Sequence, residues 1–128
     1  MILDTSALLA VIFKEPGHES VIEKLLAPGK RGVGTPTLAE AGLVLTGRIE
    51  ADGEALLSGF LRQFEVILVP FGDLHWKAAV EAFRRFGKGR HPASLNFGDC
   101  LSYATAKLAG RPLLFVGEDF SKTDLEAA

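Results

Sequence analysis

The sequence predicts an α/β domain in which a short-stranded, mainly parallel central sheet lies between two layers of helices, a three-layer α/β/α arrangement. Short apolar runs alternate with longer segments of helical periodicity along the chain. Connections that contain a helix return the chain in the same direction, which favours parallel strands with helices on both faces. No repeat or linker interrupts the sequence, so residues 1–128 are expected to form a single domain.

Strands are expected at residues 2–4, 33–35, 66–69 and 112–116. The run at 66–69 is apolar throughout and ends at Pro70, a pattern typical of a strand covered on both faces. Helices are expected at residues 7–13, 21–26, 36–49, 52–64, 73–86 and 97–108, with a loop at 87–97. Ser6 is the expected N-cap of the first helix, and Gly110 ends the last one.

The composition excludes several classes of protein. Hydrophobic residues make up 48% of the chain and the formal net charge is −2, which excludes intrinsic disorder. Cys100 is the only cysteine, so no disulfide framework forms within the chain. The apolar runs are too short to span a membrane, and Asp4 stands where a signal peptide carries basic residues, so a cytoplasmic protein is expected. A pI near 5.9 argues against nucleic-acid binding by bulk charge, but metal ions can reverse the sign of an acidic site.

Four acidic residues lie in segments expected to meet at one edge of the sheet. Asp4 follows the first strand, and Glu40 lies one turn into the helix after the second. Asp119 follows the fourth strand, and Asp99 begins the helix that leads into it. In open parallel sheets, ligands bind beyond the carboxyl ends of the strands. Closely packed carboxylates repel one another unless they are protonated or share a cation, and hard cations such as Mg²⁺ or Mn²⁺ prefer carboxylate oxygens. Paired ions of this kind are a standard device for phosphodiester cleavage.

Each of these acids also has a structural interpretation, which the sequence leaves open. Glu40 and Asp99 each lie three residues after a side chain that would complete a capping box. Asp119 is placed to cap a short helical turn, and Asp4 to turn toward Ser6.

Short motifs surround all four acids in a fixed order along the chain. They are Asp4-Thr5-Ser6-Ala7, Thr37-Leu38-Ala39-Glu40-Ala41, Phe97-Gly98-Asp99-Cys100 and Leu113-Leu114-Phe115-Val116-Gly117-Glu118-Asp119-Phe120. In order and chain length the sequence resembles the PIN-domain ribonucleases, above all the VapC-type toxins of bacterial toxin–antitoxin pairs, from residue 1 to about residue 124. Any one motif is weak evidence, whereas their combination is specific.

The resemblance implies a PIN-like fold and metal-dependent endonucleolytic cleavage of RNA. In that family, the acids matching Asp4, Glu40, Asp99 and Asp119 bind Mg²⁺ or Mn²⁺. Ser6 matches a hydroxyl residue that helps to arrange the same site. Glu118 precedes the matching acid, and the resemblance assigns it no metal-binding role.

The resemblance also implies partners: an RNA substrate, a second copy in a homodimer, and a cognate VapB-type antitoxin whose tail covers an apolar groove and the acidic site. Two apolar stripes are candidates for the groove or the dimer surface, with ordinary core packing as the alternative. One contains Val21, Ile22, Leu25 and Leu26, and the other contains Leu56, Leu57, Phe60 and Leu61.

Basic residues gather at the end of the predicted 73–86 helix and in the loop after it. They are Arg84, Arg85, Lys88 and Arg90, extended by His91. This basic cluster is a candidate site for RNA phosphates, whose contacts set affinity but carry little sequence information. A solvated helix end that complements the helix dipole is the alternative. Cys100, Trp76 and Tyr103 are expected to be core residues.

Two other functional classes are compatible with parts of the pattern. A receiver-type phosphoacceptor domain shares an acidic Mg²⁺ pocket on a parallel sheet, but it requires paired acids after the first strand and a lysine after the last. A non-catalytic protein-binding module would keep its biological effect after Asp4→Asn.

Overall fold

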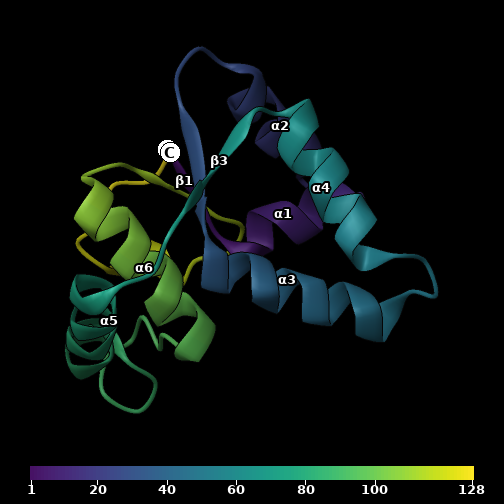
Figure 1. Cartoon of the computed structure of the whole chain (residues 1–128). Helices are drawn as coiled ribbons and strands as arrows, with labels where there is room; N and C mark the ends of the chain where they lie inside the picture. The colour runs from purple at the N-terminus through teal and green to yellow at the C-terminus, as the bar shows by residue number, and fades with distance from the viewer.

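The computed structural model describes residues 1–128, which form a four-stranded parallel sheet in the order β3-β2-β1-β4 (Figure 1). The strands are β1 (Ile2–Leu3), β2 (Arg31–Gly34), β3 (Val66–Val69) and β4 (Leu113–Leu114). The helices are α1 (Thr5–Ile12), α2 (His18–Leu26), α3 (Thr35–Arg48), α4 (Gly53–Gln63), α5 (Asp73–Phe86) and α6 (Phe97–Ala109), followed by a 3₁₀ turn, η1 (Phe120–Lys122). The prediction of an α/β fold with a parallel sheet is confirmed.

Helices cover both faces of the sheet, so the three-layer prediction is confirmed as well. On one face, helices α1 to α4 pack around Leu3 and Leu114. On the other face, α5 and α6 pack around Ile2 and Leu113. Because successive side chains of a strand point to opposite faces, two residues each of β1 and β4 are enough to join both cores. Figure 1 shows α5 and α6 on one side of the strands and α1, α2 and α4 on the other.

The prediction that residues 66–69 form a strand covered on both faces is wrong about the covering. β3 is the edge strand of the sheet, and Ile67 and Leu68 are 56% and 50% exposed. α5 packs chiefly against α6 rather than over β3. An edge strand that carries apolar side chains has the same sequence pattern as a buried one, so the pattern could not separate the two.

The prediction that Ser6 caps the first helix is also wrong. α1 already begins at Thr5, and Asp4 is its N-cap, with the Asp4 carboxylate accepting a hydrogen bond from the Ser6 backbone N–H. A carboxylate at this position satisfies a free N–H group and complements the positive end of the helix dipole.

The remaining boundaries differ from the prediction by a few residues. The second strand is Arg31–Gly34 rather than 33–35, because α3 begins at Thr35. The fourth strand is limited to Leu113–Leu114, because β1 offers it only two paired residues. Because β1 and β2 are parallel and each is followed at once by a helix, α1 and α3 start at the same edge of the sheet.

Half of the residues in the two apolar stripes are buried core, as the packing alternative expected, and Ile22 and Leu61 pack against that core partly buried. Val21 and Leu25 of α2 are buried, and so are Leu57 and Phe60 of α4. Leu26, at 68% exposure, stays on the surface. No helix in the structure combines the length and apolar character needed to cross a membrane.

Candidate active site

The candidate site lies at the carboxyl edge of the sheet, where the strand ends place the predicted acids. Asp4 lies between β1 and α1, directly after one of the two inner strands of the sheet. Glu40 comes from the second turn of α3, directly after β2, and Asp119 from the segment after β4. α6 packs across β1 and β2 and carries Asp99 in its first turn.

Asp4 is almost fully buried, at 5% exposure, and is held by Ser6. One carboxylate oxygen, Oδ2, accepts hydrogen bonds from the Ser6 backbone N–H at 3.0 Å and from its hydroxyl at 2.6 Å. The Ser6 hydroxyl in turn accepts a hydrogen bond from the Val116 N–H at 3.0 Å. Ser6 thus joins Asp4 to the segment that carries Asp119.

Glu40 has no part in the capping box that its spacing from Thr37 allowed. α3 begins at Thr35, before Thr37, and the Thr37 hydroxyl hydrogen-bonds with Ser102 instead. The Glu40 carboxylate accepts a hydrogen bond from the hydroxyl of Thr5. Glu40 is therefore oriented toward the start of α1, next to Asp4.

Asp99 combines the structural and the functional interpretation. Its N–H donates to the Asn96 side chain at 2.9 Å, and its Oδ2 accepts from the Asn96 N–H at 3.0 Å, which completes a capping box. Burial, opposed by that hydrogen bond and reinforced by the charges of Asp4, Asp119 and Glu40, raises the pKa of Asp99 to about 6. The four predicted acids therefore share one electrostatic neighbourhood.

Asp119 lies at the exposed side of this neighbourhood. It precedes η1, but its side chain makes no capping hydrogen bond, so the capping alternative for Asp119 is wrong. Glu118 beside it is exposed too, and its backbone carbonyl accepts hydrogen bonds from both the N–H and the hydroxyl of Ser121.

These residues fit a hard divalent cation by their chemistry, because all four predicted ligands are carboxylates whose mutual repulsion a cation would relieve. No three acidic, histidine or cysteine side chains already converge tightly enough to hold an ion. Cation binding therefore requires the carboxylates to draw closer together. The site has a buried side and an exposed side: Asp4 is buried, whereas Asp119 is exposed to solvent.

Two residues of the site could not be found by sequence reasoning. Thr5 binds Glu40, and Gly98 lies directly against the Glu40 carboxylate. Both belong to the motifs around Asp4 and Asp99, but neither residue type indicates a contact with a distant helix.

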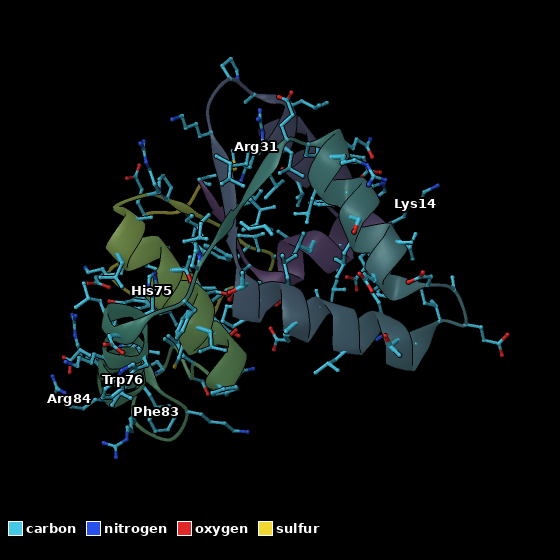
Figure 2. The ribbon with its side chains drawn as sticks, viewed as in Figure 1. Lys14, Arg31, His75, Trp76, Phe83 and Arg84 are labelled. Atoms are coloured by element: carbon cyan, nitrogen blue, oxygen red, sulfur yellow. The ribbon has the colours of Figure 1, made fainter.

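The basic cluster lies on α5 and the loop that follows, and two of its members already have acidic partners. Arg84 makes two hydrogen bonds to Glu81, and Arg85 lies 3.5 Å from Asp124. Lys88 and Arg90 form no ion pair. Figure 2 shows Arg84 at the outer edge of the molecule, on the side where α5 lies.

Of the three predicted core residues, two are confirmed. Tyr103 is buried and donates a hydrogen bond to Asp124 at 2.6 Å. Cys100 is buried, and burial together with the Asp99 charge raises the pKa of its thiol to about 11, so it is a protonated thiol at neutral pH. Trp76 is 52% exposed, so its assignment to the core is wrong.

Comparison with known proteins decides the family. Residues 1–126 match the PIN domain. The chain is a PIN-domain protein. Within that family it belongs with the VapC ribonucleases, which confirms the resemblance inferred from the motifs.

Relatives of this PIN domain match it over nearly their whole length. Ribonuclease VapC36 of Mycobacterium tuberculosis is 42% identical over 127 residues, covering 98% of this chain and 91% of the relative. Ribonuclease VapC of Mycolicibacterium smegmatis is also 42% identical over 127 residues, covering 99% and 98%. The receiver alternative is wrong, because the whole chain matches a different family.

Solved structures share the fold of this PIN domain. VapC20 of Mycobacterium tuberculosis, a toxin that cleaves the sarcin-ricin loop, superposes with a TM-score of 0.76 at 17% identity, covering 99% of this chain and 97% of that one. VapBC2 from Rickettsia felis, solved with a fragment of its promoter DNA, gives a TM-score of 0.73 at 16% identity, covering 99% and 96%.

Proposed function

We propose that this PIN domain is an endoribonuclease that hydrolyses RNA phosphodiester bonds with Mg²⁺ or Mn²⁺, and that it is the toxin of a type II toxin–antitoxin pair. The observation that carries the proposal is the placement of four carboxylates near one sheet edge, close enough for the charges of the other three to raise the pKa of Asp99. Membership among the VapC ribonucleases supports the reaction class. Residues 1–128 act as one PIN domain in this proposal.

The residues proposed to hold the cation are Asp4, Glu40, Asp99 and Asp119. When bound, the cation supplies a nucleophile from water at neutral pH and neutralises charge on the phosphodiester. The chain itself contributes orientation: Ser6 fixes Asp4, and the capping box with Asn96 fixes Asp99. RNA would approach from the side of Asp119, which is the solvent-exposed side.

The test is cleavage of single-stranded RNA with and without Mn²⁺ by the wild type and by Asp99→Asn. We expect cleavage by the wild type to require the cation and to fall at least 100-fold in Asp99→Asn, because removing one ligand charge weakens both cation binding and charge stabilisation. Glu118→Gln is the matched control, since Glu118 is a neighbouring exposed acid outside the proposed ligand set. Full activity in cation-free protein, or an undiminished Asp99→Asn, would contradict the proposal.

The non-catalytic alternative makes the opposite prediction for growth. If the chain only sequesters a partner protein, Asp4→Asn keeps its biological effect. If it is a nuclease toxin, Asp4→Asn relieves growth arrest while the variant still binds its antitoxin.

We assign the basic cluster to the RNA backbone in this proposal. Lys88 and Arg90 are expected to contribute more than Arg84 and Arg85, because their cations are not engaged by acidic side chains. Action on cellular RNA implies a cytoplasmic location.

The proposed protein partners are a VapB-type antitoxin and a second copy of the chain. Large apolar side chains remain exposed on a surface beside Glu40, here named the α3–α5–α6 face: Leu43 (76%), Phe97 (80%), Val80 (61%) and Phe83 (41%). Two apolar pockets on this face, of about 300 and 400 Å³, share Phe97 and Leu101 in their walls and are therefore adjacent. A contiguous apolar surface of this kind favours a protein interface, and we assign it to the homodimer.

A further inference from the structure

The structure assigns to Thr5 and Gly98 the role of positioning residues that fix the Glu40 carboxylate between α1 and α6. This inference rests on the proposed function, in which Glu40 is one of the cation ligands. Neither residue is itself proposed to contact the cation or the RNA.

Thr5 supplies the hydrogen-bond donor that Glu40 requires. It is the first residue of α1 and only 9% exposed, and its hydroxyl donates to Oε1 of Glu40. An ionised carboxylate only accepts hydrogen bonds, so a buried neighbour must donate. A β-branched side chain in a helix has few rotamers, which makes Thr5 a rigid donor.

Gly98 supplies the space on the other side of the same carboxylate. A Cβ atom at position 98 would overlap both oxygens of Glu40 and its Cδ atom. The φ angle of Gly98 is not positive, so its backbone conformation does not require glycine. Gly98 is the second residue of α6, and the close approach of Glu40 is the contact that favours glycine over alanine there.

Together these contacts fix a side chain that has no other support. Glu40 is partly exposed on α3, and the bond from Thr5 is the only hydrogen bond its carboxylate makes. Residues that orient a metal ligand through one hydrogen bond typically contribute 10–100-fold to metal affinity. The orientation of Glu40 is therefore set by α1 and α6, not by α3.

The first test measures Mn²⁺ binding by titration calorimetry. Thr5→Val keeps the shape of the side chain and removes the donor, and we expect Mn²⁺ affinity about 10-fold below that of the wild type. Thr5→Ser restores the hydroxyl and is expected to restore the affinity to within about twofold. Thr105→Val is the matched control: Thr105 is a buried helical threonine whose hydroxyl donates to the Leu101 carbonyl at 3.0 Å instead of a carboxylate. Equal Mn²⁺ affinity in Thr5→Val and Thr105→Val would overturn the role of Thr5.

The second test needs no cation and uses thermal unfolding in EDTA. Gly98→Ala is expected to give no gain in Tm in the wild type, because its methyl group displaces the Glu40 carboxylate from Thr5 and this loss offsets the higher helix propensity of alanine. In the Glu40→Ala background the same substitution is expected to raise Tm, since the displaced atoms are gone. Gly59→Ala, on an α4 surface with free space for a Cβ, is the control and should not lower Tm.

An equal effect of Gly98→Ala in both backgrounds would overturn the role of Gly98. The outcomes also separate this inference from the proposed function. If wild type and Asp99→Asn both fail to bind Mn²⁺, the proposed function is wrong. The coupling between Gly98 and Glu40 is measured in EDTA and does not depend on that result.

Discussion

Asp99 serves the fold and the candidate site with the same carboxyl group. Its Oδ2 closes the capping box at the start of α6, while burial and three neighbouring acids work against its ionised form. In the sequence these roles were alternatives. In the structure the cap is formed, and it leaves the proposed second role open, because the cap engages one oxygen of the carboxylate and not the other.

Removing the charge of Asp99 is expected to stabilise the cation-free protein. The raised pKa, about 6, means that folding at pH 7 places an ionised carboxylate in unfavourable surroundings. Asp99→Asn keeps an acceptor for the Asn96 N–H and removes that charge, so we expect a gain of about 1 kcal/mol in EDTA after allowance for its partial exposure. With Mn²⁺ present the order should reverse, since the wild type is stabilised more by the ion.

Thermal unfolding at pH 7 in EDTA and in Mn²⁺ measures both effects. Glu118→Gln, which removes an exposed neighbouring charge, should leave Tm unchanged within about 1 °C. A loss of stability for Asp99→Asn in EDTA would show that the ionised Asp99 carboxylate does not destabilise the folded protein.

The position of each acid could be predicted from sequence, whereas the contacts that orient the acids could not. Asp4 and Asp119 follow strands, and strand ends in a parallel sheet share one edge, so local pattern is enough to place them. Thr5 and Gly98 act through Glu40, which lies on a helix distant from both in sequence. Contacts of this kind depend on how α1, α3 and α6 pack against one another. The periodicity of the sequence does not predict that packing.

At the scale of elements, the chain after β4 is attached to α6 through Asp124. The Asp124 carboxylate accepts a hydrogen bond from Tyr103 at 2.6 Å and pairs with Lys107 at 2.9 Å, both on α6. Arg85 of α5 lies 3.5 Å away. This cluster connects α5, α6 and the C-terminal segment that begins with the candidate ligand Asp119.

Loss of the Asp124 charge is expected to destabilise the protein in a pH-dependent way. Burial acts to raise the pKa of Asp124, but the bonds from Tyr103 and Lys107 outweigh it and lower the pKa. A depressed pKa contributes stability above the unfolded value, near 3.9, which is lost as the pH falls through the folded value. Asp124→Asn should therefore cost about 1 kcal/mol at pH 7, or about 4 °C in Tm, and progressively less as the pH falls below the unfolded value.

Unfolding of the wild type and Asp124→Asn across pH 3 to 7 gives the measurement. Glu50→Gln is the control, because Glu50 is exposed and forms no ion pair. A difference between wild type and Asp124→Asn that stays constant with pH would assign the effect to packing rather than to charge.

For the whole molecule, the order of the layers could be predicted from the sequence. Which apolar side chains of the outer helices remain exposed could not. Alternation of apolar runs and helices determines a parallel sheet with two helical layers, and each layer then requires its own core. Which apolar side chains remain outside depends on how far each helix covers its neighbour. Thus Val80 and Leu43 are exposed while similar residues on α2 and α4 are core.

The α3–α5–α6 face is expected to determine the oligomeric state. Leu43→Lys places a charge in an apolar interface and should weaken the dimer at least 10-fold. Light scattering coupled to size-exclusion chromatography, at micromolar concentrations, separates dimer from monomer. Leu26→Lys alters an equally exposed leucine on α2 and should leave the mass unchanged. A wild type that stays monomeric throughout would refute the assignment of this face to a homodimer.

The open side of β3 has a consequence for how the protein behaves when concentrated. Its outer rim carries unpaired backbone groups beside Ile67 and Leu68, which is the template on which strands of other molecules stack into aggregates. Glu65, with its left-handed backbone at φ 52°, bends the chain at one end of the strand, and Pro70 withholds an N–H at the other. We therefore expect these two residues, which take no part in the proposed chemistry, to limit such stacking at this edge.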